Sequence, residues 1–327
     1  MTPWLVRRTL AALLLVLLVV SAVFFVVRLA PGDPLDQVVA EETRGEDKEL
    51  LRERLGLGRP LWRQYGAWLG GVLRGDFGAS LRQHRPVSEI VAEALPPTLL
   101  LTVTAYALHL LLAVATALVL VLRAGRPGAR ILHDAGLALY SMPTFWLGSM
   151  LILLLARQAG WFPAGGMQAP DAAYLGAGAR ALDVLHHLTL PVLTLALGSF
   201  MGTARHLRAS LTEVLASDHI LAARARGLPE RTVLVRHGLR NALLPVITLA
   251  GLSLPFLLGG AVVIEIVFGW PGMGRVTLEA IQARDYPVVM ATTTVAAVTV
   301  VSGSLLADVL YRWADPRVRL GDGEGGA

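Results

Sequence analysis

Six long apolar runs constrain what this chain of 327 residues can fold into. Each run is close to the roughly 20 residues that a helix needs to cross about 30 Å of hydrocarbon. A hydrophobic content of 54% is also too high for a soluble enzyme of this length. The sequence therefore predicts an all-α integral membrane protein with six transmembrane helices. The runs are Thr9–Val27, Thr98–Leu122, Ala135–Ala156, Leu188–Ala204, Ala242–Ile264 and Val288–Ala307.

Arginines mark the two sides of the membrane. They precede the first run, separate the second from the third and the fourth from the fifth, and follow the sixth. Segments 157–187 and 265–287 hold acids and bases in near balance. Because cytoplasmic loops carry the excess of Lys and Arg, we expect both termini in the cytoplasm and do not expect nucleic-acid binding. The first run is too long for a signal peptide, so we interpret it as a retained span.

The runs divide the chain into four parts. Residues 1–30 hold the N-terminus and the first span, and residues 31–95 form a small external insertion of helices and loops. Residues 96–311 form the core with spans two to six and a cytoplasmic loop at 205–241. Residues 312–327 form a cytoplasmic tail.

The external insertion contains its own helical signal. Pro60 suits the first turn of a helix. That helix would carry an aromatic stripe with Trp62, Tyr65 and Trp68. The stripe suits either the outer membrane–water boundary or the packing of a small lid. A glycine-rich loop at 75–80 closes the insertion.

The polar cytoplasmic loop contains a segment with the signals of a short docking helix. Ser217 can cap the helix N-terminus, and the negative charge of Asp218 suits its positive end. Gly227 suits the left-handed position after the last turn, and Pro229 prevents continuation. An ordinary amphipathic loop helix is the alternative interpretation.

Small side chains give this helix a thin surface. Ala222, Ala223 and Ala225 would let a partner protein approach closely. We expect Ala223 in particular to face that partner, with no room there for a larger side chain.

The loop resembles the signature "EAA" loop of ABC-importer permeases. Leu221-Ala222-Ala223-x3-Gly227 matches its core, although Leu221 replaces the common Glu and the distance from Gly227 to Pro245 is long. Both departures fit the dipeptide/oligopeptide/nickel branch, which Arg224-Ala-Arg-Gly-Leu228 and His237-Gly-Leu-Arg-Asn-Ala-Leu-Leu-Pro245 also resemble closely. Glu265–Arg275 and Arg284–Pro287 are similar to the same branch.

This resemblance implies a type I ABC-importer permease in the cytoplasmic membrane of a bacterium or archaeon. It implies a second, homologous permease, two ATPases that bind ATP and Mg, an external substrate-binding protein and alternating access. The chain itself is expected to bind no cofactor, since it has no Gly-x4-Gly-Lys-Ser/Thr motif. Di- or oligopeptides are the expected cargo, and nickel chelates, glutathione and oligosaccharides remain alternatives.

The resemblance assigns two groups of site residues. The residues expected to couple to the ATPases are Glu213, Ser217, Asp218, Ala222, Ala223, Arg224, Arg226, Gly227, His237, Arg240, Asn241 and Pro245. The residues expected at the external mouth or gate are Glu265, Phe268, Pro271, Gly272 and Gly274. A run of 23 residues rises about 35 Å as a helix, so Glu265 should lie at the outer boundary. There it is either a solvated helix end or part of the mouth.

Other classes of function lack their signals. A secondary transporter would normally show charges within the spans, which here are almost free of them. An intramembrane protease would need a reactive Ser setting or His-Glu-x-x-His, and neither is present. His186 and His187 are more consistent with a membrane-boundary pair than with a metal site. We therefore expect a non-catalytic subunit without a metal.

Overall fold

The computed structural model describes residues 2–29, 58–243 and 261–314, and the regular elements in these ranges are helices. A single β-bridge joins Ala79 to Pro86. The chain divides into two compact units. The first unit draws on residues 1–100, 165–167 and 261–301, and the second contains the rest.

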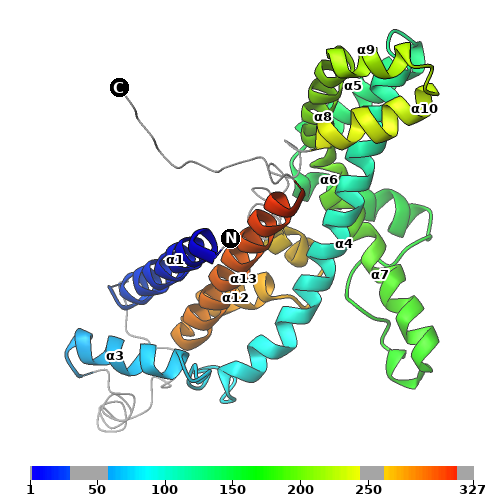
Figure 1. The fold of residues 1–327 in the computed structure, drawn as a ribbon. Helices are drawn as coiled ribbons and strands as arrows, with labels where there is room; N and C mark the ends of the chain where they lie inside the picture. Colours follow the sequence, from blue (N-terminus) through cyan, green and yellow to red (C-terminus); the bar gives the residue numbers. More distant parts are fainter. Residues whose placement is uncertain (1, 30–57, 244–260, 315–327) are drawn as a thin grey trace. The chain divides into compact units, whose positions relative to one another are not determined.

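The first unit brings together the N-terminal part of the sequence and a segment near its C-terminal end. Its elements are α1 (Thr2–Leu29), α3 (Leu61–Val72), the start of α4 (Val87–Leu122), α12 (Met273–Gln282) and most of α13 (Tyr286–Ala314) (Figure 1). Val87, Ile90 and Val91 of α4 pack with Ala280 of α12 and Val288 of α13. Residues almost 200 positions apart thus share one core.

Helix α3 packs on α1 through the aromatic stripe. The Tyr65 and Trp68 rings lie 5.3 and 5.2 Å from the Phe24 ring, measured between centroids. The Tyr65 hydroxyl is 2.7 Å from Ser21 Oγ. Trp62, by contrast, is exposed. Two rings of the stripe therefore pack α3 onto α1, and the third is exposed.

The second unit contains the end of α4 and the helices of the polar loop at 205–241 (Figure 1). In its core, Leu207 and Leu211 of α8 (Phe200–Leu215) pack with Ala117 of α4 and with Leu234 of the π-helix Val233–Leu239. Its other elements are α5 (Pro127–Ser141), α6 (Thr144–Leu151), a π-helix (Ile152–Gln158), a 3-10 turn (Ala172–Tyr174), α7 (Ala177–Leu197), α8 (Phe200–Leu215), α9 (Asp218–Ala225), α10 (Glu230–Thr232) and a second π-helix (Val233–Leu239).

Three of the predicted spans are single helices that are long and apolar enough to cross a membrane, namely α1, α4 and α13. The third and fourth runs are instead bent pairs, with angles of 108° between α5 and the α6 segment and 48° between α7 and α8. Counting each pair as one span gives up to five. The fifth run lies largely outside the described residues.

The third run is bent rather than continuous, and Pro143 explains the break. Proline has no amide hydrogen for the helix ladder and disfavours helical geometry at the residue before it. Met142 accordingly has an extended conformation with ψ 139°. In the fourth run, Ser199 leaves helical geometry with φ −130°.

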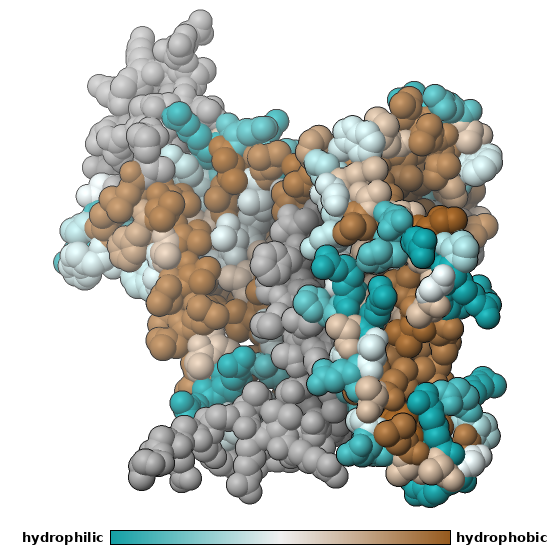
Figure 2. Space-filling model, turned by 90° about the horizontal axis from the view of Figure 1, so that it is seen from above, coloured by the Kyte–Doolittle hydropathy of each residue, from teal (hydrophilic) through white to brown (hydrophobic). Residues whose placement is uncertain are grey.

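Helix α1 exposes most of its apolar surface. Only 11% of its most apolar window is buried inside the protein. Figure 2 shows exposed apolar side chains as brown areas bordered by teal polar residues. Such a large apolar surface is typical of contact with lipid.

Candidate functional site

Helix α9 ends in the left-handed turn that the sequence predicts. Gly227 has φ +76°. Its N–H donates to Arg224 O at 2.9 Å, and Leu228 N donates to Ala223 O at 3.4 Å. These two bonds are those of a Schellman motif, with Leu228 completing its apolar contact against Ala223 and its neighbours. The expectation for Gly227 is confirmed.

The start of α9 differs from the sequence-based prediction in how the Ser217 side chain bonds. Ser217 occupies the cap position and its carbonyl accepts from Ile220 N at 3.1 Å. Its hydroxyl makes no capping bond to the helix and instead donates to Val214 O at 2.5 Å. Ser217 Oγ is also 2.8 Å from His219 Nδ1. The predicted side-chain cap is therefore wrong, although Asp218 does begin the helix.

Ala223 does not face outward. Its side chain is fully buried within the chain, where it packs with Ile220 and Val233. Ile220 and Ala223 are three residues apart and share one face of the helix. Ala222 and Ala225 are exposed on other faces. The prediction that Ala223 faces a partner is wrong, because its side chain is buried within the chain, whereas Ala222 is exposed.

Two side-chain contacts hold α9 to the segment that follows it. The Arg224 guanidinium donates to Glu230 at 2.6 and 3.2 Å, and these bonds lower the pKa of the Glu230 carboxyl. His219 Nε2 lies 3.3 Å from Asn241 Nδ2. His219 was not predicted as a site residue, because its link to Asn241 spans 22 positions.

The remaining coupling residues have simpler surroundings. The Arg226 guanidinium donates to Ala222 O at 3.2 Å, and the His237 carbonyl accepts from the Asn241 amide at 3.0 Å. Glu213 and Arg240 are exposed. Pro245 lies outside the described residues. Figure 1 shows α8, α9 and α10 gathered at one end of the second unit, which collects most of the predicted coupling residues in one place.

Glu265 is the centre of a second site, in the first unit. Its side chain is 0% exposed. Its carboxylate accepts from Thr98 Oγ1 at 2.5 Å and from Arg275 N at 3.1 Å. Thr98 Oγ1 in turn accepts from Met273 N at 2.8 Å. The interpretation of Glu265 as a solvated helix end is wrong. The carboxylate is buried, and it accepts hydrogen bonds from Thr98 and from the turn that follows it.

Glycines let the turn 268–274 close around this carboxylate. A Cβ at Gly272 would overlap the Glu265 carboxylate, and one at Gly274 would lie 2.8 Å from Glu265 Oε2. The Phe268 carbonyl accepts from Gly166 N at 2.7 Å. The backbone here approaches a side chain so closely that only glycine fits.

Buried aromatics fix the same turn, with Pro271 exposed beside them. Phe268 and Trp270 are both buried, and Trp270 Nε1 donates to Pro97 O at 2.9 Å. Trp270 and Thr98 were not predicted as site residues. The structure therefore brings the predicted mouth residues together in one turn. This turn is held by buried side chains and hydrogen bonds.

A third contact joins the glycine-rich loop at 75–80 to the segment at 284–287. Ser80 Oγ donates to Asp285 Oδ2 at 2.5 Å, and Leu81 N donates to Asp285 Oδ1 at 3.2 Å. Asp285 is buried and Ser80 closes the glycine-rich loop. The insertion is thereby fixed to the segment that precedes α13.

Three histidines have side-chain partners within the protein, namely His109, His186 and His187. His186 Nε2 is 2.8 Å from Trp161 O, and His187 Nδ1 is 3.2 Å from Asp183 Oδ1. His109 lies between Ser199 Oγ at 2.8 Å and Thr203 Oγ1 at 2.9 Å. Within the residues that the structure describes, no group of three His, Cys, Asp or Glu could hold a metal ion.

Comparison with known proteins places this arrangement among transport proteins. The family model described as "Binding-protein-dependent transport system inner membrane component" matches residues 109–320. Its N-terminal companion, "Binding-prot-dependent transport system membrane comp, N-term", matches residues 1–102. The two models together span almost the whole chain.

Curated relatives match over nearly their full length. The oligopeptide transport system permease protein AppB of Bacillus subtilis (strain 168) is 40% identical over 324 residues, covering 97% of this chain and 99% of that protein. The glutathione transport system permease protein GsiC of Escherichia coli (strain K12) is 34% identical over 319 residues, covering 98% and 99%.

Solved structures are similar in fold. An inward-facing form of the MetNI methionine ABC transporter gives a TM-score of 0.53 at 19% identity, covering 69% of this chain and 96% of that chain. An amino acid ABC transporter with histidines gives 0.51 at 18% identity, covering 69% and 94%. The similarity of these structures confirms the predicted permease fold.

Proposed function

We propose that this chain, which belongs to the family of binding-protein-dependent transport system inner membrane components, moves di- and oligopeptides across the membrane. As a member of that family it is a multi-pass membrane permease that works with partner subunits of an ABC transporter. The peptide cargo is inferred from a relative named for oligopeptide transport and another named for glutathione transport, itself a small peptide.

The exposed face of α9 is the observation that supports docking of a partner subunit. Ala222 and Ala225 project little from this face, so a partner can approach the helix backbone closely. Behind it, Ala223 and Ile220 pack against Val233, which makes the helix a rigid extension of the unit. A rigid helix with a thin outer face transmits displacement from a docked protein instead of bending.

The proposed partners are two separate ATPases, a second permease and an external binding protein. ATP closure of the ATPase pair would displace α9, and the attached membrane helices would then rock outward. This chain binds no nucleotide in the scheme and catalyses nothing, so ATP and Mg stay on the partner subunits. Both termini and α9 are cytoplasmic in the bacterial or archaeal cytoplasmic membrane.

The Glu265 turn is assigned to the outer mouth. Its buried hydrogen bonds from Thr98 and Arg275 make it a fixed edge against which moving helices can close. Because the binding protein delivers the substrate, nickel chelates, glutathione and oligosaccharides remain alternative cargoes for the same machinery.

Cysteine cross-linking in the assembled transporter tests the coupling proposal. The chain has no native cysteine, so Ala222→Cys introduces a single reactive position. We expect it to cross-link to a cysteine placed in the ATPase, and Ala124→Cys, exposed in the loop between the second and third runs, to cross-link far less. Equal yields at the two positions would refute docking on α9.

A further inference from the structure

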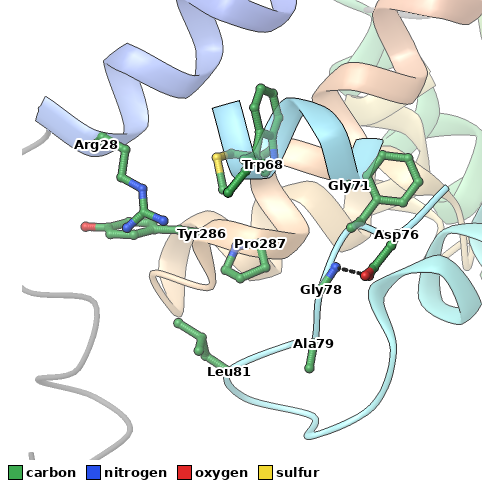
Figure 3. A pocket seen from close by; sticks show the side chains of 12 residues that line it. Arg28, Trp68, Gly71, Asp76, Gly78, Ala79, Leu81, Tyr286 and Pro287 are labelled. Carbon is green, nitrogen blue, oxygen red and sulfur yellow. Dashed lines mark hydrogen bonds between the residues drawn. The ribbon is translucent and has the colours of Figure 1, made fainter. Parts of the chain in front are cut away.

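The first unit contains a pocket of about 270 Å³ beside the end of α1. Its lining includes Arg28 of α1, Trp68 of α3, Asp76 of the glycine-rich loop and Tyr286 of α13 (Figure 3). In this view Arg28 and Tyr286 lie at one side of the pocket and Asp76 at the other. One positive and one negative side chain thus border the same cavity, with aromatic rings between them.

One nitrogen of the Arg28 guanidinium group has no hydrogen-bond partner among the described residues. This nitrogen, Nε, is buried. The Phe24 ring centroid lies 5.8 Å from the guanidinium carbon, and Tyr286 lies beside the guanidinium group (Figure 3). Leaving a buried charged donor unsatisfied is unfavourable, so an anion that accepts from Arg28 would be stabilised.

Asp76 offers the complementary chemistry. Its Oδ1 accepts from Gly78 N at 2.9 Å, and among the described residues its Oδ2 has no partner. A purely anionic ligand would be repelled by this carboxylate. The pocket is suited to a ligand that carries an anion and an ammonium a few bonds apart.

The position of the pocket indicates where such a ligand comes from. Arg28 is the last residue but one of the membrane-spanning segment Trp4–Leu29, so it lies at headgroup depth. Trp and Tyr are enriched at that depth. The neighbouring α1 surface is apolar and open, with Val26 and Leu29 both 69% exposed. Acyl chains can follow this surface directly from the pocket.

We propose that the pocket binds the headgroup of a phosphatidylethanolamine molecule. The phosphate accepts hydrogen bonds from the Arg28 guanidinium, which has the forked geometry that suits phosphate oxygens. The ammonium donates to Asp76 and lies near the Trp68 ring, where a cation is attracted by the aromatic face. The lipid then links α1, α3 and α13, three elements far apart in sequence.

Native mass spectrometry of the purified transporter complex tests the proposal. The complex is extracted from liposomes that contain equal amounts of phosphatidylethanolamine and phosphatidylglycerol, and retained lipids are counted. We expect retained phosphatidylethanolamine, and a roughly tenfold weaker retention in Arg28→Gln, since a charge-assisted hydrogen bond is removed. Arg28→Lys should fall between the two, because it keeps the charge without the fork.

Matched variants separate this site from general lipid attraction. Arg63→Gln removes an exposed arginine of α3 that does not line the pocket, and retention should stay unchanged. Asp76→Asn should shift retention from phosphatidylethanolamine toward phosphatidylglycerol. Circular dichroism of each variant confirms that its helices are intact.

A zwitterionic peptide shares the same chemistry and is distinguished by competition. Adding a millimolar dipeptide to the liposomes should leave the retained lipid unchanged. Displacement of the lipid by the dipeptide, equal retention by Arg28→Lys and the parent protein, or no preference over phosphatidylglycerol would each overturn the proposal.

Discussion

The Thr98 hydroxyl donates a 2.5 Å hydrogen bond to the buried Glu265 carboxylate, across 167 positions of sequence. The same hydroxyl oxygen accepts from Met273 N, so Thr98 contacts the turn at two points. The contact ties the start of the second apolar run to the end of the fifth. The Glu265 carboxylate is thus the centre around which the turn 268–274 folds.

Replacing this carboxylate should destabilise the protein. In Glu265→Gln the hydrogen bonds from Thr98 Oγ1 and from Arg275 N lose their charged partner, and neutral hydrogen bonds are roughly half as strong as charge-assisted ones. We expect a lower Tm in detergent and reduced uptake. Glu279→Gln, which alters a half-exposed carboxylate of α12, should leave Tm unchanged. Equal Tm values for both variants and the parent would show that the Glu265 bonds do not stabilise the turn.

The two adjacent alanines of α9 should respond differently to the same substitution. Ala222→Glu adds bulk and charge to an exposed position, so it should weaken ATPase binding while Tm stays unchanged. Ala223→Glu places a charge in the apolar contact with Ile220 and Val233, so Tm should fall. Ala216→Glu, exposed and outside α9, should change neither.

Co-purification of the ATPase in mild detergent and thermal unfolding are the two measurements. Loss of ATPase binding in Ala216→Glu as severe as in Ala222→Glu would indicate a general charge effect. An unchanged Tm in Ala223→Glu would contradict its burial.

Local signals predicted local features well. Long apolar runs gave α1, α4 and α13, because length and hydropathy alone decide whether a helix can span a bilayer. Gly227 gave the end of α9, because a left-handed residue after a helix is a property of the backbone itself. The fold of the family was predicted correctly from such signals together with the resemblance.

Features that depend on distant partners were not predicted. Whether Ala223 points inward depends on Val233, and whether Glu265 is solvated depends on Thr98. The Ser217 hydroxyl had a competing acceptor at Val214 O, and that competition is decided by geometry rather than by residue type. The pairing of Ser80 with Asp285 joins two recognised motifs that nothing in the sequence connects.

The orientation of the chain is open to direct measurement. Because arginine-rich segments stay in the cytoplasm, reporter fusions after Arg208 and after Arg319 should report cytoplasm, and one at Glu46 should report the outside. A cytoplasmic signal at Glu46 would contradict a membrane-spanning α1 with an external insertion.

Gly227 should be required for uptake only because of its left-handed backbone geometry. Its φ is +76°, and no atom outside its immediate neighbours lies within 4 Å of an added Cβ, so a substitution meets strain rather than a clash. That strain is about 1–2 kcal/mol for a residue with a side chain and is greatest for β-branched ones. We expect Gly227→Val to reduce uptake strongly and Gly227→Asn to reduce it little, because Asn tolerates left-handed geometry. Gly128→Ala, at an exposed glycine of α5 with ordinary φ, should transport normally. Uptake is measured at equal membrane abundance, and equal rates for Gly227→Val and Gly227→Asn would show that the left-handed turn is not what coupling requires.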